Sequence, residues 1–236
     1  MTEALLRIKG LRAGYGGKPV LQGIDLEVAK GEIVAVIGRN GVGKSTLMKT
    51  LIGLVDSMAG TIRLDSTELT GLTPFRRARL GIGYVPQGRD VFPRMSVREN
   101  LQVGESMKGR VAPDIYEHIY QLFPILKERS KQQAGTMSGG QQQQLAIGRV
   151  LVGSPRLLLL DEPSEGIQPS IVQDMGRIIK QLNRDSGMTI MFVEQNPDMI
   201  KALAQRCYVI DKGRIVAHVT PHELEDRDTI RKYLAV

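Results

Sequence analysis

A glycine-rich segment in the first fifth of the chain carries residue types that bind phosphate groups. It fits the pattern G-x-x-x-x-G-K-[ST] over its whole length and reads Gly38-Arg39-Asn40-Gly41-Val42-Gly43-Lys44-Ser45-Thr46. The glycines allow backbone N–H groups to surround a chain of phosphates, and the start of a following helix would add partial positive charge. Lys44 would place its ammonium on the outer phosphates, and Ser45 would give its hydroxyl to Mg²⁺. We predict a phosphate-binding loop, which by itself does not separate kinases, GTPases and ATPases.

Two adjacent carboxylates, Asp161 and Glu162, follow a run of four leucines at residues 157–160. The run predicts a buried strand, and successive residues at the end of a strand point in different directions. Asp161 would then orient water on Mg²⁺, which is a Walker B role. Glu162 would face the γ-phosphate and polarise the attacking water, because phosphoryl transfer needs such positioning more than covalent chemistry.

Strand and helix patterns in the first third of the chain position the loop. Alternating apolar residues and a β-branched run predict strands at residues 6–8, 24–28, 32–37 and 61–65. The third of these would enter the loop as a buried strand, and the last is expected to be an edge strand. A helix would follow the loop, since Leu47, Leu51 and Val55 recur at four-residue spacing.

The middle of the chain, about residues 87–153, has a mostly helical pattern and is expected to form an inserted lobe. Ile115, Ile119 and Leu122 fall on one helical face, and prolines break the segments at Pro93, Pro113 and Pro124. Alternation then returns, with a strand at 157–160, a helix at 171–182, a strand at 189–193 and a hairpin at 207–219. This order predicts an α/β protein with a mostly parallel sheet.

The composition limits the class of protein. The chain has 236 residues, of which 42% are hydrophobic and 24% charged, which argues against a disordered chain. Its length predicts one compact domain with an insertion, or one large and one small lobe. No apolar window of about 18 residues could span a membrane, and the N-terminus has no pattern of a secretory signal. The single cysteine, Cys207, fits a reducing compartment and is expected to be a buried small hydrophobe.

A short motif ahead of the two carboxylates carries a family resemblance. Ser138-Gly139-Gly140-Gln141, preceded by Met137, resembles the L-S-G-G-Q signature of ABC ATPases, and the order of loop, Gln87, signature and carboxylates is also that of the family. The resemblance implies a P-loop NTPase core of the ABC ATPase type, with an antiparallel β subdomain and an inserted helical subdomain. It divides one domain, residues 1–236, into a core at 1–86 and 154–220, a helical signature subdomain at 87–153 and a C-terminal helix at 221–236.

The resemblance also implies roles for single residues. In ABC ATPases the signature of one subunit binds the γ-phosphate held by the other, so the active unit is a head-to-tail dimer. Ser138 would be an N-cap, with Gly139 and Gly140 as exposed amides. Tyr15 matches the aromatic residue that stacks on adenine, and Gln87 matches the loop glutamine that contacts Mg²⁺ and links the helical lobe to a membrane partner. The cofactors would be ATP and Mg²⁺. ATP would be bound by the phosphate loop, Tyr15, Gln87 and residues 138–141. The metal would be bound by Ser45, Gln87 and Asp161.

Two positions depart from the family pattern. The histidine that usually contacts the γ-phosphate is replaced by Gln195. Gln195 and Glu162 are the two predicted catalytic residues. The three histidines of the chain lie elsewhere, at His118, His218 and His222. Glutamine can donate a hydrogen bond but cannot carry a charge or shuttle a proton, so we expect hydrolysis to be shared less evenly between two sites. The position of the usual D-loop aspartate is occupied by Gln168.

Two other stretches resemble a subgroup of importers. Residues 193–196 (V-E-Q-N) and 88–93 (G-R-D-V-F-P) resemble the ATP-binding subunits of branched-chain amino acid importers, and residues 165–170 look more like the urea and short-amide importers. The likeness implies a sister ATPase subunit in a heterodimer or homodimer, two integral-membrane permease subunits and an external solute-binding protein. The chain would lie at the cytoplasmic face of the inner membrane, with no nucleic acid as partner.

The net charge leaves a second class open. A surplus of 7 positive charges suits a phosphate ligand, an acidic membrane surface or a nucleic acid, and it does not choose between them. The alternative is a soluble ABC ATPase that acts on nucleic acid or ribosomes, against which stand the lack of a basic run and an aromatic content of only 4%. A third class, a small-molecule kinase, has no use for the signature at residues 138–141. The sequence does not give the transported substrate.

Overall fold

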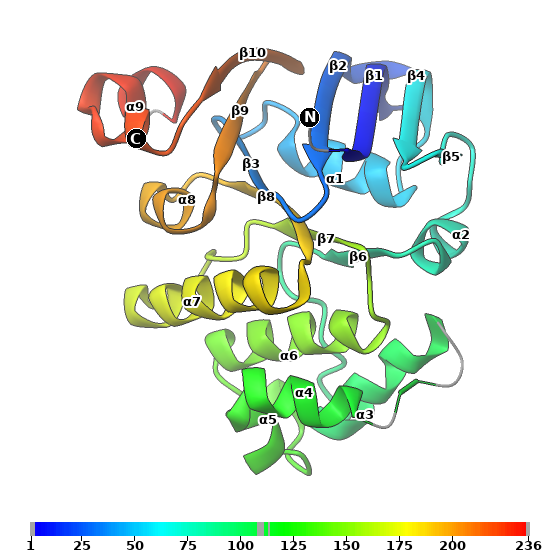
Figure 1. Ribbon diagram of the computed structural model, residues 1–236, viewed down its shortest axis with the longest axis vertical. Helices are drawn as coiled ribbons and strands as arrows, with labels where there is room; N and C mark the ends of the chain where they lie inside the picture. Colours follow the sequence, from blue (N-terminus) through cyan, green and yellow to red (C-terminus); the bar gives the residue numbers. More distant parts are fainter. Residues whose placement is uncertain (1–2, 108–110, 113, 235–236) are drawn as a thin grey trace.

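The computed structural model describes residues 3–107, 111–112 and 114–234, which form two sheets and a group of helices (Figure 1). A six-stranded sheet has the order β10-β9-β3-β8-β7-β6, and a four-stranded sheet has the order β2-β1-β4-β5. The strands are β1 Ala4–Tyr15, β2 Lys18–Ala29, β3 Ile33–Ile37, β4 Ser57–Leu64, β5 Thr67–Glu68, β6 Ile82–Val85, β7 Leu157–Asp161, β8 Thr189–Glu194, β9 Arg206–Asp211 and β10 Arg214–Val219. The helices are α1 Lys44–Ile52, α2 Pro74–Arg79, α3 Val97–Val103, η1 Gly104–Met107, α4 Ile115–Leu122, α5 Pro124–Glu128, η2 Ala134–Thr136, α6 Gly139–Val152, α7 Pro169–Ser186, α8 Pro197–Leu203, η3 His222–Glu225 and α9 Arg227–Tyr233.

The six-stranded sheet is parallel from β6 to β9, and only β10 runs antiparallel. Every residue of β3, β7 and β8 is buried, as expected for parallel strands that are covered on both faces. Alternate side chains enter two different cores: Leu158 and Leu160 face the helical part, whereas Leu157 and Leu159 face α1 and the smaller sheet. The predicted α/β architecture is therefore confirmed.

The four-stranded sheet is antiparallel and packs over α1, which lies between the two sheets (Figure 1). The strand expected at residues 61–65 is present but longer, and the prediction that it is an edge strand was wrong. β4 pairs with β1 on one side and with the two-residue β5 on the other. The helix after the phosphate loop ends at Ile52, before Val55, because Gly53 takes a left-handed conformation with φ 88° that closes the helix.

The helical part converges on α6. A Cβ atom added at Gly148 would lie 3.1–3.2 Å from side chains of Leu126, Ile119 and Leu101, which come from α5, α4 and α3. The missing side chain thus lets three helices approach α6 closely. Pro124 begins α5 rather than merely breaking a segment, and Pro113 lies outside the described residues. Within the described residues, no helix combines the length and apolar character needed to span a membrane.

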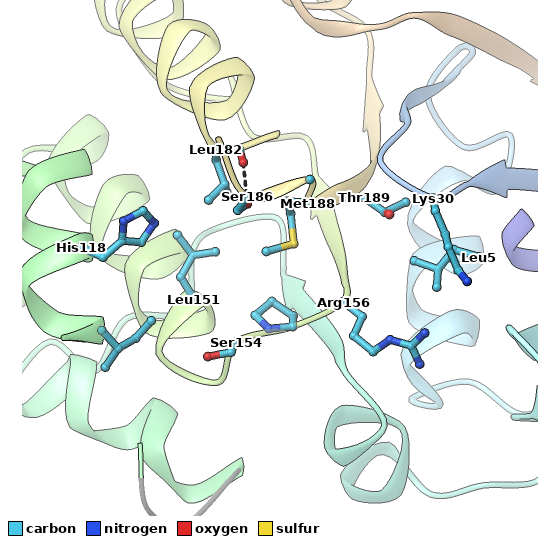
Figure 2. A pocket seen from close by; sticks show the side chains of 13 residues that line it. Leu5, Lys30, His118, Leu151, Ser154, Arg156, Leu182, Ser186, Met188 and Thr189 are labelled. Atoms are coloured by element: carbon cyan, nitrogen blue, oxygen red, sulfur yellow. Dashed lines mark hydrogen bonds between the residues drawn. The ribbon is translucent and has the colours of Figure 1, made fainter. Parts of the chain in front are cut away.

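A cavity of about 460 Å³ opens at the amino ends of β7 and β8, where α4 and α7 approach the sheet (Figure 2). Two long cations at its edge, Lys30 and Arg156, already pair with Asp65, and Lys30 also lies 2.7 Å from Glu3. The phosphate-binding loop follows the carboxyl end of β3, which is parallel to β8. The cavity is therefore at the opposite edge of the sheet from the predicted site.

Candidate functional site

The phosphate-binding loop connects β3 to α1, as the sequence predicted. A Cβ atom at Gly38 would lie 2.3 Å from the carbonyl oxygen of Ile210, so the loop passes too close to β9 for any other residue. Gly43 caps α1 with φ 116°, a conformation that side chains rarely adopt. These two glycines set the path of the loop and leave its remaining N–H groups at the start of α1.

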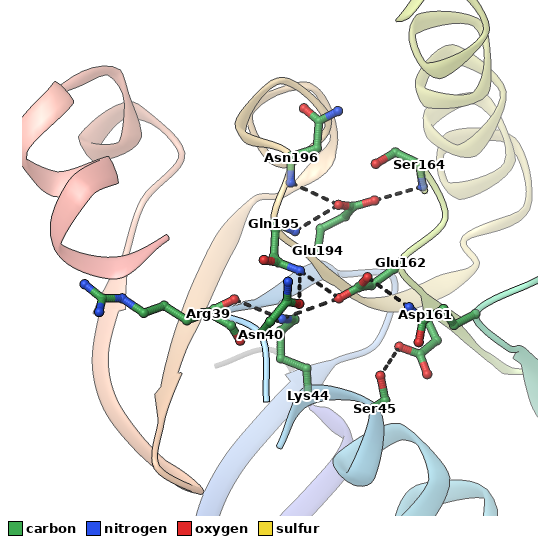
Figure 3. Close-up of polar contacts among 12 residues, drawn as sticks. Arg39, Asn40, Lys44, Ser45, Asp161, Glu162, Ser164, Glu194, Gln195 and Asn196 are labelled. Atoms are coloured by element: carbon green, nitrogen blue, oxygen red, sulfur yellow. Dashed lines mark hydrogen bonds and ion pairs between the residues drawn. The ribbon is translucent and has the colours of Figure 1, made fainter. Parts of the chain in front are cut away.

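Lys44 begins α1 and is only 4% exposed. Its Nζ donates hydrogen bonds to the carbonyl oxygens of Gly38 at 2.9 Å and Arg39 at 3.0 Å, and it lies 3.4 Å from Oε1 of Glu162 (Figure 3). A buried ammonium is stable only with such partners. The loop thus holds a positive charge where the outer phosphates of a nucleotide would lie.

Asp161 ends β7 beside the first turn of α1. Ser45 Oγ donates to its Oδ1 at 2.9 Å, and the hydroxyl of Tyr84 donates to its Oδ2 at 3.1 Å. Burial raises the pKa of Asp161, although both hydrogen bonds oppose this. Burial and the charge of Asp161 raise the pKa of Tyr84, so the phenol keeps its proton and remains a donor. The sequence did not single out Tyr84.

Glu162 points away from Asp161, as expected for successive residues at a strand end. Its backbone has φ 47°, which is uncommon for a residue other than glycine and costs energy that the surrounding structure must offset. Its carboxylate accepts hydrogen bonds from Nε2 of Gln195 at 3.1 Å and from Nε2 of Gln87 at 3.4 Å, besides the contact with Lys44. The structure therefore brings together all four of these predicted side chains.

Gln195 connects the carboxylate to the loop. Its Nε2 donates to Oδ1 of Asn40 at 2.6 Å as well as to Glu162. The amide therefore occupies a place between the phosphate-binding loop and the carboxylate that would activate water.

Two adjoining cavities lie around these groups. One of about 330 Å³ is lined mainly by the phosphate-binding loop, and one of about 550 Å³ extends along the loops after β7 and β8. Asn40, Gln87 and Glu162 line both. The two together give a continuous recess beside the carboxylate that could take a triphosphate.

The signature residues do not line either cavity. Ser138 caps α6 as expected: its hydroxyl accepts from the N–H of Gln141 at 3.4 Å, and the side chain of Gln141 accepts from the N–H of Ser138 at 3.1 Å. Gly139 is half-buried. Gly140 is buried against Ile171 rather than exposed, and the expectation of an exposed amide there was wrong.

Tyr15 and Arg39 also lie apart from the recess. Tyr15 ends β1 with 52% of its surface exposed, and it lines neither cavity. The side chain of Arg39 points away from Lys44 (Figure 3) and lines a separate cavity of about 440 Å³ beside β9 and α9, so only its carbonyl oxygen takes part in the loop.

A residue missed in the sequence, Glu194, holds two of the site's loops together. Its carboxylate, only 3% exposed, accepts backbone N–H groups from Ser164 at 2.8 Å, Gln195 at 2.9 Å and Asn196 at 3.0 Å. Such charge-assisted bonds fix the loop after β7 to the loop after β8. The signal was available, because Glu194 ends a buried apolar strand just as Asp161 does.

This phosphate site, with a buried lysine and two carboxylates at strand ends, defines a nucleotide-hydrolysing protein of the P-loop class. The ABC transporter family model matches residues 21–165. The chain belongs to the ABC transporter family and is an ABC-type ATPase.

The relatives align with this chain over nearly its whole length. BraG of Pseudomonas aeruginosa, a high-affinity branched-chain amino acid transport ATP-binding protein, is 47% identical over 218 residues, covering 92% of this chain and 93% of that protein. LptB of Escherichia coli K12, from a lipopolysaccharide export system, is 36% identical and covers 98% and 97%. The ADP conformation of MJ1267, an ATP-binding cassette of an ABC transporter, superposes with a TM-score of 0.86 at 26% identity and covers 99% and 98%.

Proposed function

We propose that this chain is the ATP-hydrolysing subunit of an importer for branched-chain amino acids or for urea and short amides. The observation that carries the proposal is the 47% identity to BraG over 92% of the chain. The segments 88–93 and 193–196, which resemble the branched-chain subgroup, both contribute to the site through Arg89 and Gln195. Because a subunit of an export system is also 36% identical, the direction of transport is tested by the reconstitution described below.

The residues present fit Mg²⁺ bound together with ATP. Mg²⁺ is usually held by one or two protein oxygens plus phosphate oxygens, and Ser45 Oγ lies 2.9 Å from Asp161 Oδ1 at the mouth of the phosphate-binding loop. We assign Ser45 and Asp161 to the metal, with Gln87 beside it, and Lys44 to the outer phosphates. When bound, the metal would neutralise charge on the phosphate oxygens. Glu162 would orient and polarise the attacking water, with Gln195 fixing its position.

The working unit is proposed to be a head-to-tail dimer. Supporting this, the capped amino end of α6 at Ser138 lines neither cavity of its own chain, although a helix N-terminus is suited to bind an anion. A partner, either a sister ATPase subunit or a second copy, would bring its phosphate-binding loop to this helix end. In that unit residues 1–86 and 154–220 serve as the nucleotide-binding core and residues 87–153 as the signature subdomain, with Tyr15 stacking on adenine.

An apolar cleft supports docking to membrane permease subunits. It has a volume of about 380 Å³, lies between α2 on one side and η1 and α6 on the other, and includes Phe75. Phe75 is 53% exposed at this cleft. A short amphipathic segment of a permease would cover it. The chain would then lie peripherally at the cytoplasmic face of the membrane, in a system with an external solute-binding protein.

The test is reconstitution with candidate permease and sister subunits in proteoliposomes. With ATP inside the vesicles and the binding protein outside, we expect labelled leucine, or labelled urea and acetamide, to accumulate inside. The Glu162→Gln subunit should abolish this uptake. Failure of the chain to associate with any permease pair would contradict the proposal. Salt-sensitive binding of RNA or DNA by the chain alone would favour the nucleic-acid alternative.

A further inference from the structure

We propose that Arg89 is a positioning residue for ATP hydrolysis, which ties the loop after Glu162 to the amino end of the signature helix. Arg89 lies in the loop between β6 and α3, two residues after Gln87. Its Nη2 donates to the carbonyl oxygens of Glu165 at 2.8 Å and Gly166 at 3.3 Å. These carbonyls belong to the turn that follows Glu162 and leads into α7.

The same guanidinium covers the start of α6. A Cβ atom on Gly139 would lie 3.1–3.3 Å from the Arg89 guanidinium, so the guanidinium packs directly against this glycine. A Cβ atom on Gly166 would meet Nη2 at 3.3 Å. One cation therefore lies between the turn after the catalytic carboxylate and the first residue of the signature helix.

The backbone around Arg89 is held in an unusual conformation. Gly88, Arg89 and Asp90 have φ values of 84°, 73° and 46°, and two of the three are not glycine. The carbonyl of Arg89 accepts from Nη2 of Arg149 on α6 at 3.4 Å, and its N–H donates to the carbonyl of Pro86 at 3.1 Å. Positive φ at residues other than glycine persists only where the surroundings fix it. The side chain is therefore aimed by the loop.

The electrostatics fit the same role. Within the described residues, no carboxylate lies within ion-pair distance of Arg89, and its partly exposed guanidinium donates to carbonyl oxygens instead. The charge adds to the partial positive charge at the start of α6. Under the proposed function this helix end meets the γ-phosphate held by the partner. Arg89 would thus set both the place and the potential of the signature while restraining the loop after Glu162.

The test compares three variants of the full chain. Arg89→Met keeps the aliphatic stem and removes the charge and the donors, Arg89→Lys keeps the charge and one donor group, and Arg94→Ala is a control at an exposed position of the same loop. We expect Arg89→Met to lower kcat about 10- to 100-fold, the scale for misplaced catalytic groups. Binding of a fluorescent ATP analogue to the dilute chain should change less than about twofold, because Arg89 touches no part of its own phosphate-binding loop. Arg89→Lys should recover part of kcat, and Arg94→Ala should match the wild type.

A second measurement separates this inference from the proposed dimer. In the Glu162→Gln background, ATP-dependent dimerisation followed by light scattering should weaken about tenfold with Arg89→Met. If the Glu162→Gln chain alone forms no dimer with ATP, the proposal of a homodimer is contradicted. The comparison of kcat values still decides the role of Arg89. A kcat of Arg89→Met within twofold of the wild type would overturn the inference. The inference would also be overturned if Arg89→Lys recovered none of the kcat and if the loss of kcat in each variant paralleled a fall in its melting temperature.

Discussion

Three side chains approach the carboxylate of Glu162, the proposed catalytic residue. Lys44 and Gln195 both approach its Oε1, and Gln87 approaches its Oε2. A phosphate chain that enters the loop would compete for Lys44, because phosphate oxygens also accept charge-assisted hydrogen bonds from lysine. Glu162 would then be released toward the nucleotide while Gln195 keeps its orientation.

Glu162→Gln tests the carboxylate directly. The amide keeps the shape and the contact with Gln87 but cannot polarise water as a carboxylate does, so we expect hydrolysis to fall more than about 100-fold. ATP binding should remain, and ATP should hold the chain in a dimer. Turnover and nucleotide binding, measured side by side, check this. Unchanged turnover would exclude Glu162 as the activating group.

Glu194→Gln tests the buried carboxylate that joins two loops. One carboxylate oxygen would become an amide group, which cannot accept from a backbone N–H, so we expect the free energy of unfolding to fall by about 1–3 kcal/mol. Turnover should fall as well, because Gln195 loses its anchor. Urea unfolding measures the first effect. Glu165→Gln, at an exposed position in the loop after β7, is the control, and equal losses in both variants would contradict the assignment.

Single residues were predictable where their motif is local. The phosphate-binding loop and the Asp161–Glu162 pair are each contiguous in sequence, and the pattern of each implies its position at a strand end. Arg89 contacts residues 76 and 77 positions away, and no local pattern indicates such a contact. Its recognition required the three-dimensional arrangement of two loops and a helix.

At the scale of elements, α3 and α6 begin in the same way. Ser96 and Glu99 form a capping box on α3, and Ser138 and Gln141 form one on α6. The strands of the core were predictable because their apolar periodicity is strong. The boundaries of α1 and the place of β4 within its sheet were not, because a glycine in a left-handed conformation and a two-residue neighbouring strand decide them.

The matched caps allow structure and function to be separated. Ser96→Ala and Ser138→Ala should each lower the free energy of unfolding by about 1 kcal/mol, through loss of an N-cap. Only Ser138→Ala should also lower turnover, since its hydroxyl faces the partner's phosphate in the proposed dimer. Chemical unfolding and steady-state hydrolysis of both variants check this. Equal turnover in the two variants would indicate that Ser138 is only a cap.

At the scale of the whole molecule, the proposed dimer requires each chain to supply two incomplete halves of a site. The loop and the carboxylates line one recess, and the amino end of α6 lies outside it. Within a single chain, the helix end that we propose to bind phosphate therefore lies outside the recess around the phosphate-binding loop. Association of two chains about a two-fold axis would complete both halves, because the same surface of each chain then forms the contact.

Mixing two inactive variants tests this arrangement. Lys44→Ala inactivates the phosphate-binding loop and Ser138→Ala inactivates the signature. A mixed dimer therefore contains one intact site, formed by the loop of the Ser138→Ala chain and the signature of the Lys44→Ala chain. With random pairing, about a quarter of all sites would be intact, and ATP hydrolysis should reappear on mixing. Each variant alone is the control. No recovery, with both variants folded and the wild type active, would contradict a site shared between two copies of this chain.

The only cysteine in the sequence is expected not to react with thiol reagents in the folded protein. Cys207 lies on β9 with 1% of its surface exposed, and burial raises its pKa to about 12. A maleimide label or an oxidant at neutral pH would leave it untouched, since the thiolate is the reactive form. Substitutions such as Ser138→Cys and Asn40→Cys can thus serve as cross-linking or fluorescence reporters of subunit closure in the otherwise wild-type chain.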